Sequence, residues 1–341
     1  MQKKFDTLIF IGRFQPVHNA HVDIIRRAAA MAKQVVIVIG SSFQPRTYKN
    51  PFTADERAKM LRYAVTNNVT ARVHIEYNRD SMYNDQAWAT RVQELVGKHT
   101  QRGEKVGIIG HSKDESSFYL KMFPQWEHEE VELIEPLHAT DIRDLYFKED
   151  AHLKYLKAVV PHEVFEFLTE FKETDQYKQI IKEREFVATY KKQYESFPYA
   201  PTFVTADAVV LQSGHVLMIK RKAEPGRGTF ALPGGFLNAA TDKSVVDAAL
   251  RELREETGLK VPAPVLRGSI RHREVYDAID RSSRGRTITH AVLIVLEDGP
   301  LPRVKGQDDA EKAVWVPLAE VDSSIMFEDH YDIIMDMVGK L

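Results

Sequence analysis

The sequence predicts a chain of two domains, an N-terminal α/β domain with a doubly wound parallel sheet and a C-terminal α+β domain with a mixed sheet. Three observations lead to this expectation. The 341 residues are long for one domain, since a typical domain has about 150. Short apolar runs alternate with helical segments in the first half, which is typical of parallel strands joined by crossover helices. The second half changes to longer strands around one strong helix.

The N-terminal elements follow from hydrophobic periodicity. Apolar runs at 7–12 and 34–40 end in glycine and suit buried strands, and residues 21–33 between them have helical spacing. Thr53 and Glu56 are placed as a capping box. The other expected elements are helices at 53–65, 85–99, 140–147 and 161–171 and strands at 72–77, 105–110 and 131–136.

A charged helical stretch separates the two halves. Residues 172–200 lose the alternation, and prolines stand at its end, so we expect a connector there. The predicted divisions are an N-terminal domain of residues 1–184, a linker of residues 185–200 and a C-terminal domain of residues 201–341. The strands expected after the linker lie at 202–212, 215–221, 286–297 and 312–318.

Composition excludes several classes of function. The 49 acidic and 47 basic residues nearly balance, so no global field favours nucleic acid or an anionic membrane surface. The absence of cysteine removes disulfides, thiolate nucleophiles and cysteine-ligated zinc. The first apolar run is short and is broken by Arg13 and Gln15, unlike a signal peptide or a spanning helix. We therefore expect a cytoplasmic protein with small-molecule substrates, and a homo-oligomer stays open.

Two histidines stand at an expected helix start in the segment GRFQPVHNAHV. His18 and His21 are one helical turn apart, so both rings can face an anion held by the free backbone N–H groups of the helix N-terminus. Imidazole donors there could stabilise charge that builds up on a phosphoryl group. The alternative is a pair of satisfied, partly buried histidines.

Further polar residues follow the expected strands. Arg143 lies in the first turn of an expected helix that Thr140 can cap, and it could reach a polyphosphate; an ordinary solvated arginine is the alternative. The segment after the second strand places several candidates where a doubly wound sheet binds ligands: Gly40, Ser41, Arg46, Lys49 and Arg57.

The segments GRFQPVHNAH, KNPFTADER and TDIRDL, in this order, resemble the Rossmann-like nucleotidyltransferases, specifically the archaeal-type nicotinamide mononucleotide (NMN) adenylyltransferases. The resemblance implies transfer of AMP from ATP to NMN, which gives NAD and pyrophosphate with the help of Mg²⁺. It implies that His18 and His21 contact the ATP phosphates and that Arg143 holds the β and γ phosphates. It also implies that the nucleotide pocket is lined by Gly12, Arg13 and Phe14.

One residue of this resemblance has an alternative interpretation, and another departs from the family motif. Trp88 matches a family tryptophan that stacks on the nicotinamide ring, and a half-buried helix tryptophan is the alternative. Ala20 stands where the family motif HxGH has glycine. Helical backbone tolerates the added methyl group, so we expect activity to survive.

Three carboxylates share one helix face in RELREETGL. Glu252, Glu255 and Glu256 fall at i, i+3 and i+4, and such close like charges are unfavourable unless a cation neutralises them. Oxygen ligands of this kind suit Mg²⁺ or Mn²⁺. Arg251 can orient Glu255, and a solvated stripe with an arginine partner is the alternative.

The segment from Gly235 to Leu259 resembles the Nudix box, G-x5-E-x7-REUxEExGU, in which U is aliphatic. Its second half matches fully. In its first half the leading glutamate falls at Lys243 and the spacing is two residues longer, so Asp242 is the candidate substitute. The resemblance implies a metal site of Glu252, Glu255 and Glu256, with Glu255 or Glu256 as the base.

The same resemblance extends to ligand binding and to the whole chain. DRSSRGRTITHA is similar to the segment that follows the box in ADP-ribose pyrophosphatases. It implies an ADP-ribose site with Gly234, Gly235, Arg281, Arg284 and Arg286, although a solvated basic loop is the alternative. Together the two halves resemble bifunctional NMN adenylyltransferase/Nudix hydrolases.

Two rival functions stay open at this point. The altered box is compatible with a weakly active or non-catalytic ADP-ribose sensor in the C-terminal half. The N-terminal half could instead be a related transferase that joins CTP or ATP to another phosphate or alcohol.

Overall fold

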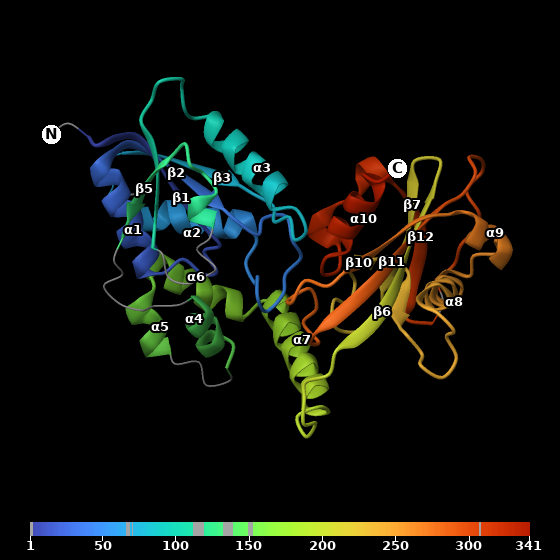
Figure 1. Cartoon of the computed structure of the whole chain (residues 1–341). Coiled ribbons are helices and arrows are strands. Elements are labelled where there is room, and N and C mark those ends of the chain that lie inside the picture. The colour runs from blue at the N-terminus through green and yellow to red at the C-terminus, as the bar shows by residue number, and fades with distance from the viewer. Residues whose placement is uncertain are drawn as a thin grey trace. The chain divides into compact units, whose positions relative to one another are not determined.

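The computed structural model describes residues 3–65, 69, 71–111, 119–131, 139–148, 153–306 and 308–341 (Figure 1). It divides into two compact units, Met1–Ile181 and Lys182–Leu341. The division falls within helix α7 (Asp175–Lys192), so the first residues of the predicted linker, 185–192, continue a helix.

The first unit is built on a five-stranded sheet with the order β3-β2-β1-β4-β5, and every neighbouring pair is parallel. This confirms the doubly wound parallel sheet. Its strands are β1 (Phe5–Gly12), β2 (Ala32–Ile39), β3 (Arg72–Tyr77), β4 (Val106–Gly110) and β5 (Glu127–Glu130). The helices of this unit before α7 are α1 (Asn19–Met31), α2 (Ala54–Val65), α3 (Asp85–Gly97), α4 (Ala139–Tyr146), α5 (Leu153–Val159) and α6 (His162–Lys172).

The last strand of this sheet lies earlier than predicted. Its residues Glu127–Glu130 are charged, and an edge strand needs no apolar run because one side of its backbone stays unpaired. The predicted strand at 131–136 falls almost entirely outside the described residues.

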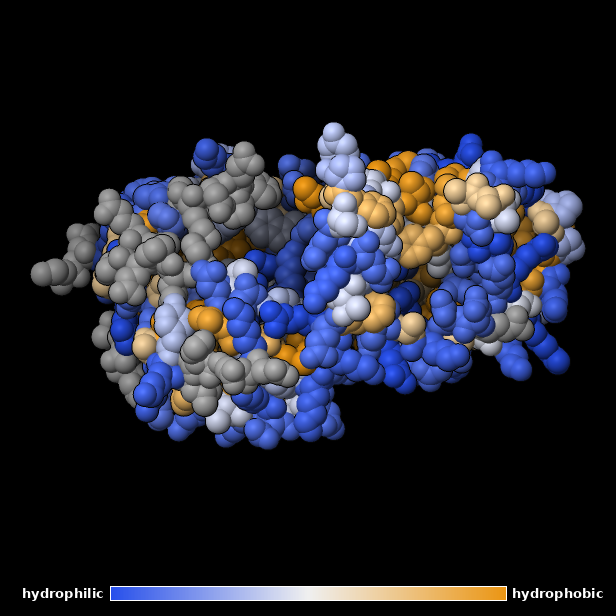
Figure 2. Space-filling view, turned by 90° about the horizontal axis from the view of Figure 1, so that it is seen from below, coloured by the Kyte–Doolittle hydropathy of each residue, from blue (hydrophilic) through white to orange (hydrophobic). Residues whose placement is uncertain are grey.

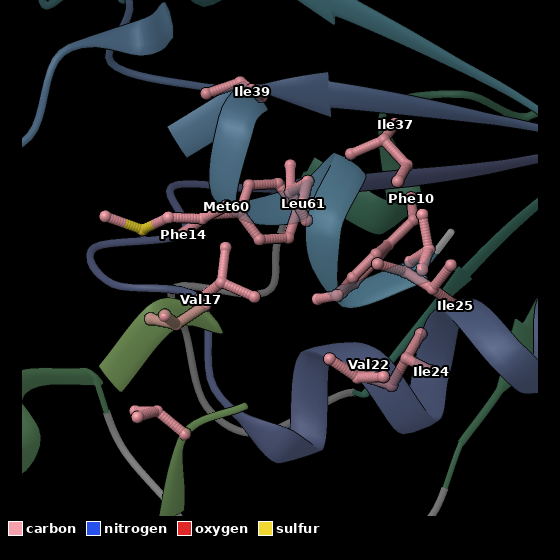
Figure 3. Packing of buried hydrophobic residues seen from close by; sticks show 14 of the residues in the cluster. Phe10, Phe14, Val17, Val22, Ile24, Ile25, Ile37, Ile39, Met60 and Leu61 are labelled. Carbon is pink, nitrogen blue, oxygen red and sulfur yellow. The ribbon is translucent and has the colours of Figure 1, made fainter. Parts of the chain in front are cut away.

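Burial on both faces explains why the strands of this unit are continuously apolar. Along β1, Leu8 and Phe10 enter the hydrophobic cluster beneath α1 and α2, and Ile9 and Ile11 enter the cluster beneath α3. Figure 3 shows Phe10 of β1 and Leu61 of α2 within the first cluster.

The predicted capping box at the start of α2 is confirmed. The backbone N–H of Thr53 donates to Glu56 Oε2 at 2.8 Å, and the N–H of Glu56 donates to Thr53 Oγ1 at 3.3 Å. Two otherwise free donors of the first turn are thereby satisfied.

The second unit is built on a mixed sheet, as predicted. Its path runs β10-β11-β6-β7-β12, with β8 and β9 paired to its middle strands, and the β11–β6 pair is parallel while the others are antiparallel. The strands are β6 (Phe203–Gln212), β7 (His215–Arg221), β8 (Phe230–Ala231), β9 (Gly234–Phe236), β10 (Ile270–Tyr276), β11 (Thr287–Val295) and β12 (Ala310–Pro317).

Helix α8 (Val245–Thr257) carries the carboxylates of this unit. The hydroxyl of Ser244 accepts from the N–H of Asp247 at its start, and Gly258 ends it with φ 59°. Its apolar face packs on the sheet through Leu250 and Leu253. Helices α9 (Ala263–Gly268) and α10 (His330–Val338) complete the unit.

Figure 2 shows hydrophilic residues over most of the visible face, with hydrophobic residues in patches between them. No helix in the described part of the chain is long and apolar enough to cross a bilayer.

Candidate active sites

The two histidines of the first unit lie face to face at the start of α1. His18 is the N-cap residue, and the ring centroids of His18 and His21 are 3.6 Å apart at an interplanar angle of 29°. The backbone N–H of His18 donates to His21 Nδ1 at 3.3 Å. Because Nδ1 accepts this bond, the neutral ring carries its proton on Nε2, which can donate to an anion.

Burial keeps His21 neutral. It lowers the pKa of His21 well below 6.5, and the neighbouring His18 lowers the pKa further. His21 therefore offers a hydrogen-bond donor without a formal charge.

We expect nitrogen NMR of the full chain to show His21 as the neutral Nε2–H tautomer at about pH 6, because its lowered pKa delays protonation. A titration midpoint of His21 near 6.5 would contradict this prediction.

Arg143 binds the loop that precedes the two histidines, although 128 residues separate it from Gln15. Its Nη1 donates to the carbonyl of Gln15 at 2.8 Å and its Nη2 to Thr140 Oγ1 at 3.1 Å. The side chain of Gln15 exchanges two hydrogen bonds with the backbone of Phe52, at 2.9 and 3.0 Å. Hydrogen bonds to Gln15, three residues before His18, thus join three segments that are distant in the sequence.

Arg57 is 1% exposed, and its guanidinium acts as a clamp that binds backbone carbonyls of two loops. Its Nη1 donates at 2.7 Å to the carbonyls of both Arg13 and Gly40, and its Nη2 to that of Ser41 at 2.9 Å. Its pKa is lowered to about 10, mainly by burial and also by Arg13, while the neighbouring Asp80 opposes this shift. Arg57 therefore joins the loops that follow β1 and β2 through their backbones.

The other predicted residues of these loops have close backbone contacts. A side chain at Gly12 would come within 2.9 Å of the Phe14 ring, and the N–H of Gly40 donates to the carbonyl of Gly12 at 2.9 Å. Ser41 binds Asp80 through its N–H at 3.1 Å and its hydroxyl at 2.6 Å. Asp80 is a contributor that the sequence analysis missed, since no motif marks it.

Trp88 packs within the α3 side of the first unit. Its ring lies 6.1 Å from both Tyr119 and Phe123 and is partly buried. These contacts fit the packing alternative, so stacking on a ligand ring stays a prediction. Arg46, of the loop before α2, forms two bonds with Glu56, at 2.6 and 2.7 Å.

Arg251 organises the carboxylates of the second unit. Its Nε and Nη2 each donate to a different oxygen of Asp242 at 2.9 Å, while Nη1 donates to Glu252 at 2.7 Å and to Glu255 at 2.9 Å. Asp242 is 4% exposed in its side chain. Asp242 therefore binds the arginine in place of the glutamate that the spacing of the Nudix box puts at Lys243. The loop before α8 is two residues longer than in the box, and it brings the shorter aspartate side chain to Arg251.

We expect Asp242→Ala to lower about tenfold the hydrolytic activity that the Nudix resemblance implies, because loss of a residue that holds a ligand-bearing side chain typically costs 10–100-fold. Asp242→Glu should keep most of the activity. The matched control is Lys243→Ala on the neighbouring exposed residue, which should leave the rate unchanged. Steady-state assays of the variants test this role of Asp242, and equal losses in both alanine variants would contradict it.

Glu256 lies against the glycine pair. Its Oε2 accepts from the N–H of Gly234 at 2.9 Å, and the residue is 5% exposed. Its pKa is raised to about 8, mainly by burial and also by Glu252 and Asp207, while the bond from Gly234 and the charge of Arg221 oppose this shift. A side chain at Gly235 would meet the Glu252 carboxylate at 2.6 Å. A side chain at Gly234 would meet the Asp207 carboxylate, so both positions have room only for glycine.

These carboxylates fit a divalent cation whose remaining coordination positions are filled by other ligands. The pKa of Glu252, like that of Glu256, is raised by burial, so a cation that stabilises the anionic forms would be favoured. Mg²⁺ binds through one or two carboxylates plus water and phosphate oxygens. Among the described residues, no three acidic or histidine side chains already form a complete cage. Glu252 and Glu256 are the more buried of the three carboxylates and would hold the ion, whereas the Glu255 side chain is 45% exposed.

The three predicted arginines after the box differ in their surroundings. Arg281 forms a buried ion pair with Asp329 through two bonds, at 2.8 and 2.9 Å. Arg286 lies 3.9 Å from Asp277. Arg284 is partly exposed, and its guanidinium lies 5.1 Å from the centroid of the Phe236 ring. Of the three, Arg284 has the most capacity left for a ligand.

Two family models match consecutive parts of the chain, and the first includes the connector. A cytidylyltransferase-like model matches residues 9–200, and a NUDIX domain model matches residues 201–337. The ranges meet at the prolines that follow α7.

Relatives of each half have known names. Nicotinamide/nicotinic acid mononucleotide adenylyltransferase of Acinetobacter baylyi is 42% identical over 178 residues, which cover 52% of this chain and 92% of that protein. ADP-ribose pyrophosphatase of Methanocaldococcus jannaschii is 35% identical over 159 residues, which cover 47% of this chain and 82% of that protein.

Solved structures match nearly the whole chain. Two crystal structures of a bifunctional NMN adenylyltransferase/ADP ribose pyrophosphatase from Francisella tularensis cover 98% of this chain and 99% of theirs. One has 36% identity and a TM-score of 0.90. The other, complexed with AMP and a manganese ion, has 34% identity and a TM-score of 0.89.

Proposed function

This chain belongs to the bifunctional NMN adenylyltransferase/ADP-ribose pyrophosphatase family, and from that premise we propose that it catalyses two reactions of NAD metabolism. The first unit transfers AMP from ATP to NMN, and the second hydrolyses ADP-ribose to AMP and ribose 5-phosphate. The assignment of residues 1–184 and 201–341 to these activities, with a linker at 185–200, and a cytoplasmic place for both are part of the proposal.

The chemistry of NAD synthesis suits the first site. The NMN phosphate attacks the α-phosphorus of ATP, a new P–O bond forms, and the bond to pyrophosphate breaks. No protein nucleophile is needed, so positioning and charge stabilisation carry the reaction. The observation that supports this most is the neutral, donating His21 beside His18, with Arg143 bound to the same loop. Mg²⁺ would neutralise phosphate charge.

A substrate screen tests the first activity. The purified chain is incubated with ATP or CTP and with NMN, nicotinic acid mononucleotide, phosphopantetheine or glycerol 3-phosphate. NAD formation from NMN and ATP is the expected result. Turnover of another pair without any use of NMN would contradict the assignment and support a related transferase.

The chemistry of ADP-ribose hydrolysis suits the second site. Water attacks one phosphorus of the diphosphate, and the P–O bond to the bridging oxygen breaks to release AMP and ribose 5-phosphate. A divalent metal ion would polarise the diphosphate and favour ionisation of the water. Glu252 and Glu256 would hold that ion, and Gly234 and Gly235 let the backbone approach them.

The intact support around Arg251 favours an enzyme over a sensor. Asp242 supplies the carboxylate that Lys243 cannot, so the altered box keeps a four-bond arrangement around its arginine. Incubation of the full chain with ADP-ribose and Mg²⁺ or Mn²⁺ tests this. Sustained AMP release is expected, whereas tight binding without release would support the sensor.

A further inference from the structure

A polar cluster in the first unit lies at the edge of the sheet opposite the pair His18 and His21, and the proposed chemistry does not use it. Thr7, Gln34 and His74 are each the third residue of their strands, β1, β2 and β3. They lie where the parallel strands begin, whereas His18 follows the carboxyl end of β1. The cluster is therefore remote from the expected phosphate site.

The cluster lies on the sheet face that α3 covers. Ile9 of β1 and Val36 of β2 belong to the hydrophobic cluster beneath α3. Thr7 and Gln34 are two residues earlier in the same strands and point to the same face. Within α3 these apolar contacts extend to Val96, and polar groups meet the residues that follow the helix.

Gln34 joins three elements through its side chain. Its Nε2 donates to Thr7 Oγ1 at 2.9 Å and to the carbonyl of His99, just after α3, at 2.7 Å. Because both donors of the amide are used in this way, Gln34 Oε1 is the acceptor for His74 Nε2 at 3.2 Å. Neutral His74 therefore carries its proton on Nε2.

The imidazole rings of His74 and His99 are stacked. Their centroids lie 4.1 Å apart at an interplanar angle of 27°. His99 Nε2 donates to Glu76 Oε1 at 2.7 Å, and Lys98 Nζ donates to the other oxygen of the same carboxylate at 3.1 Å. We call His74, His99, Gln34 and Glu76 the histidine cluster. It holds the C-terminal end of α3 on the sheet.

The charges around the stacked rings favour one protonated ring over two. The carboxylate of Glu76 can balance one cationic ring, but Lys98 already shares it. Burial lowers the pKa of His74 below 6.5, and His99 and Arg72 lower it as well, while Glu76 opposes this shift. The charged groups that face the rings come from β3, from the end of α3 and, through Thr7, from the segment before β4: Arg72, Glu76, Lys98 and Glu104.

We propose that the histidine cluster is an acid-sensitive lock on the C-terminal end of α3. Protonation of both rings places two like charges face to face, so the rings separate and the segment at His99 leaves the sheet. Helix α3 also carries Trp88, so its release weakens NMN binding. This last consequence rests on the proposed function, whereas the lock itself does not.

The lock weakens in acid and not in base. The pKa of His74 is lower in the folded chain than the ordinary 6.5, so the unfolded chain binds this proton more readily. The stabilisation is therefore complete above about pH 6.5 and is lost as the pH falls below that value.

Hydrogen exchange of the full chain tests the lock. Between about pH 7.5 and about pH 5, protection at the C-terminal end of α3, corrected for intrinsic exchange, should fall about tenfold more than protection in β1. In His74→Gln this difference should disappear, because glutamine can still donate to Gln34 but takes up no proton. His162→Gln is the control, since this histidine has 68% of its side chain exposed and lies on α6.

A second variant tests whether the two rings act as a pair. His99→Gln keeps a donor for Glu76 and should also remove the acid sensitivity. The double variant His74→Gln/His99→Gln should show no further change, because either replacement alone removes the repulsion. Contributions of the two histidines that simply add would overturn the pairing.

An equal fall of α3 protection in the wild type and in His74→Gln would overturn the lock. So would a midpoint of His74 at or above 6.5 in an NMR titration of the wild type, which needs no variant to fold. The KM for NMN should rise more steeply in acid for the wild type than for His74→Gln. Absence of NAD synthesis would contradict the proposed function and would leave the exchange result unaffected, so the two failures are distinguishable.

Discussion

The His21→Ala variant is expected to make NAD about 100 to 1,000 times more slowly than the wild type, because removal of one preorganised donor to a developing oxyanion has this effect. Its Nδ1 is occupied by the backbone of His18, and burial keeps the ring neutral. The Nε2–H is therefore the group lost. ADP-ribose hydrolysis in the same sample should stay at the wild-type rate.

A matched replacement separates this effect from general damage. His162→Ala removes an exposed histidine of the same unit, with 68% of its side chain accessible, and should leave both activities unchanged. Loss of both activities in His21→Ala would mean that the sites are coupled or that the fold has collapsed. Thermal unfolding distinguishes these two cases.

The Glu256→Gln variant is expected to show the reverse pattern, with ADP-ribose hydrolysis lower by about a thousandfold, or about 4 kcal/mol of transition-state stabilisation. Glutamine can still accept the bond from Gly234 but cannot become an anion. It therefore keeps the local packing and removes a metal ligand. NAD synthesis should not change.

Glu255→Gln provides the comparison within the same helix. Glu255 is bound to Arg251 and has 45% of its side chain exposed, whereas Glu256 is buried. We expect the loss in Glu255→Gln to be the smaller one, as measured by AMP release at saturating metal. A larger loss at Glu255 would contradict the assignment of Glu256 as the main ligand.

The fold could be predicted wherever burial controls the pattern. Strand β1 is buried on both faces and has a continuous apolar run, and α8 has a strong apolar face with clear caps. Strands β5 and β10 lie at sheet edges and carry charged residues, so periodicity did not reveal them. Helix α10 was not predicted, although Ile333, Ile334 and Met337 form its buried face.

The candidate sites were predictable in residue type more than in arrangement. Motifs pointed to His18, Arg143 and Glu256, but no spacing rule could show that Arg57 is a clamp for backbone carbonyls. Hydrogen bonds of this kind depend on how loops distant in the sequence meet. The sequence named Asp242 as the candidate substitute for the leading glutamate of the box, but it could not show that Asp242 binds Arg251. The longer loop changes the spacing between these two residues.

The central claim is that one chain carries two separate phosphate-transfer sites, and phosphorus NMR of the wild-type chain tests it most directly. With NMN, ATP and Mg²⁺ we expect the diphosphate signal of NAD and that of pyrophosphate to appear in equal amounts. With ADP-ribose and the same metal we expect AMP and ribose 5-phosphate in equal amounts. Failure of either reaction while the other proceeds would contradict the claim.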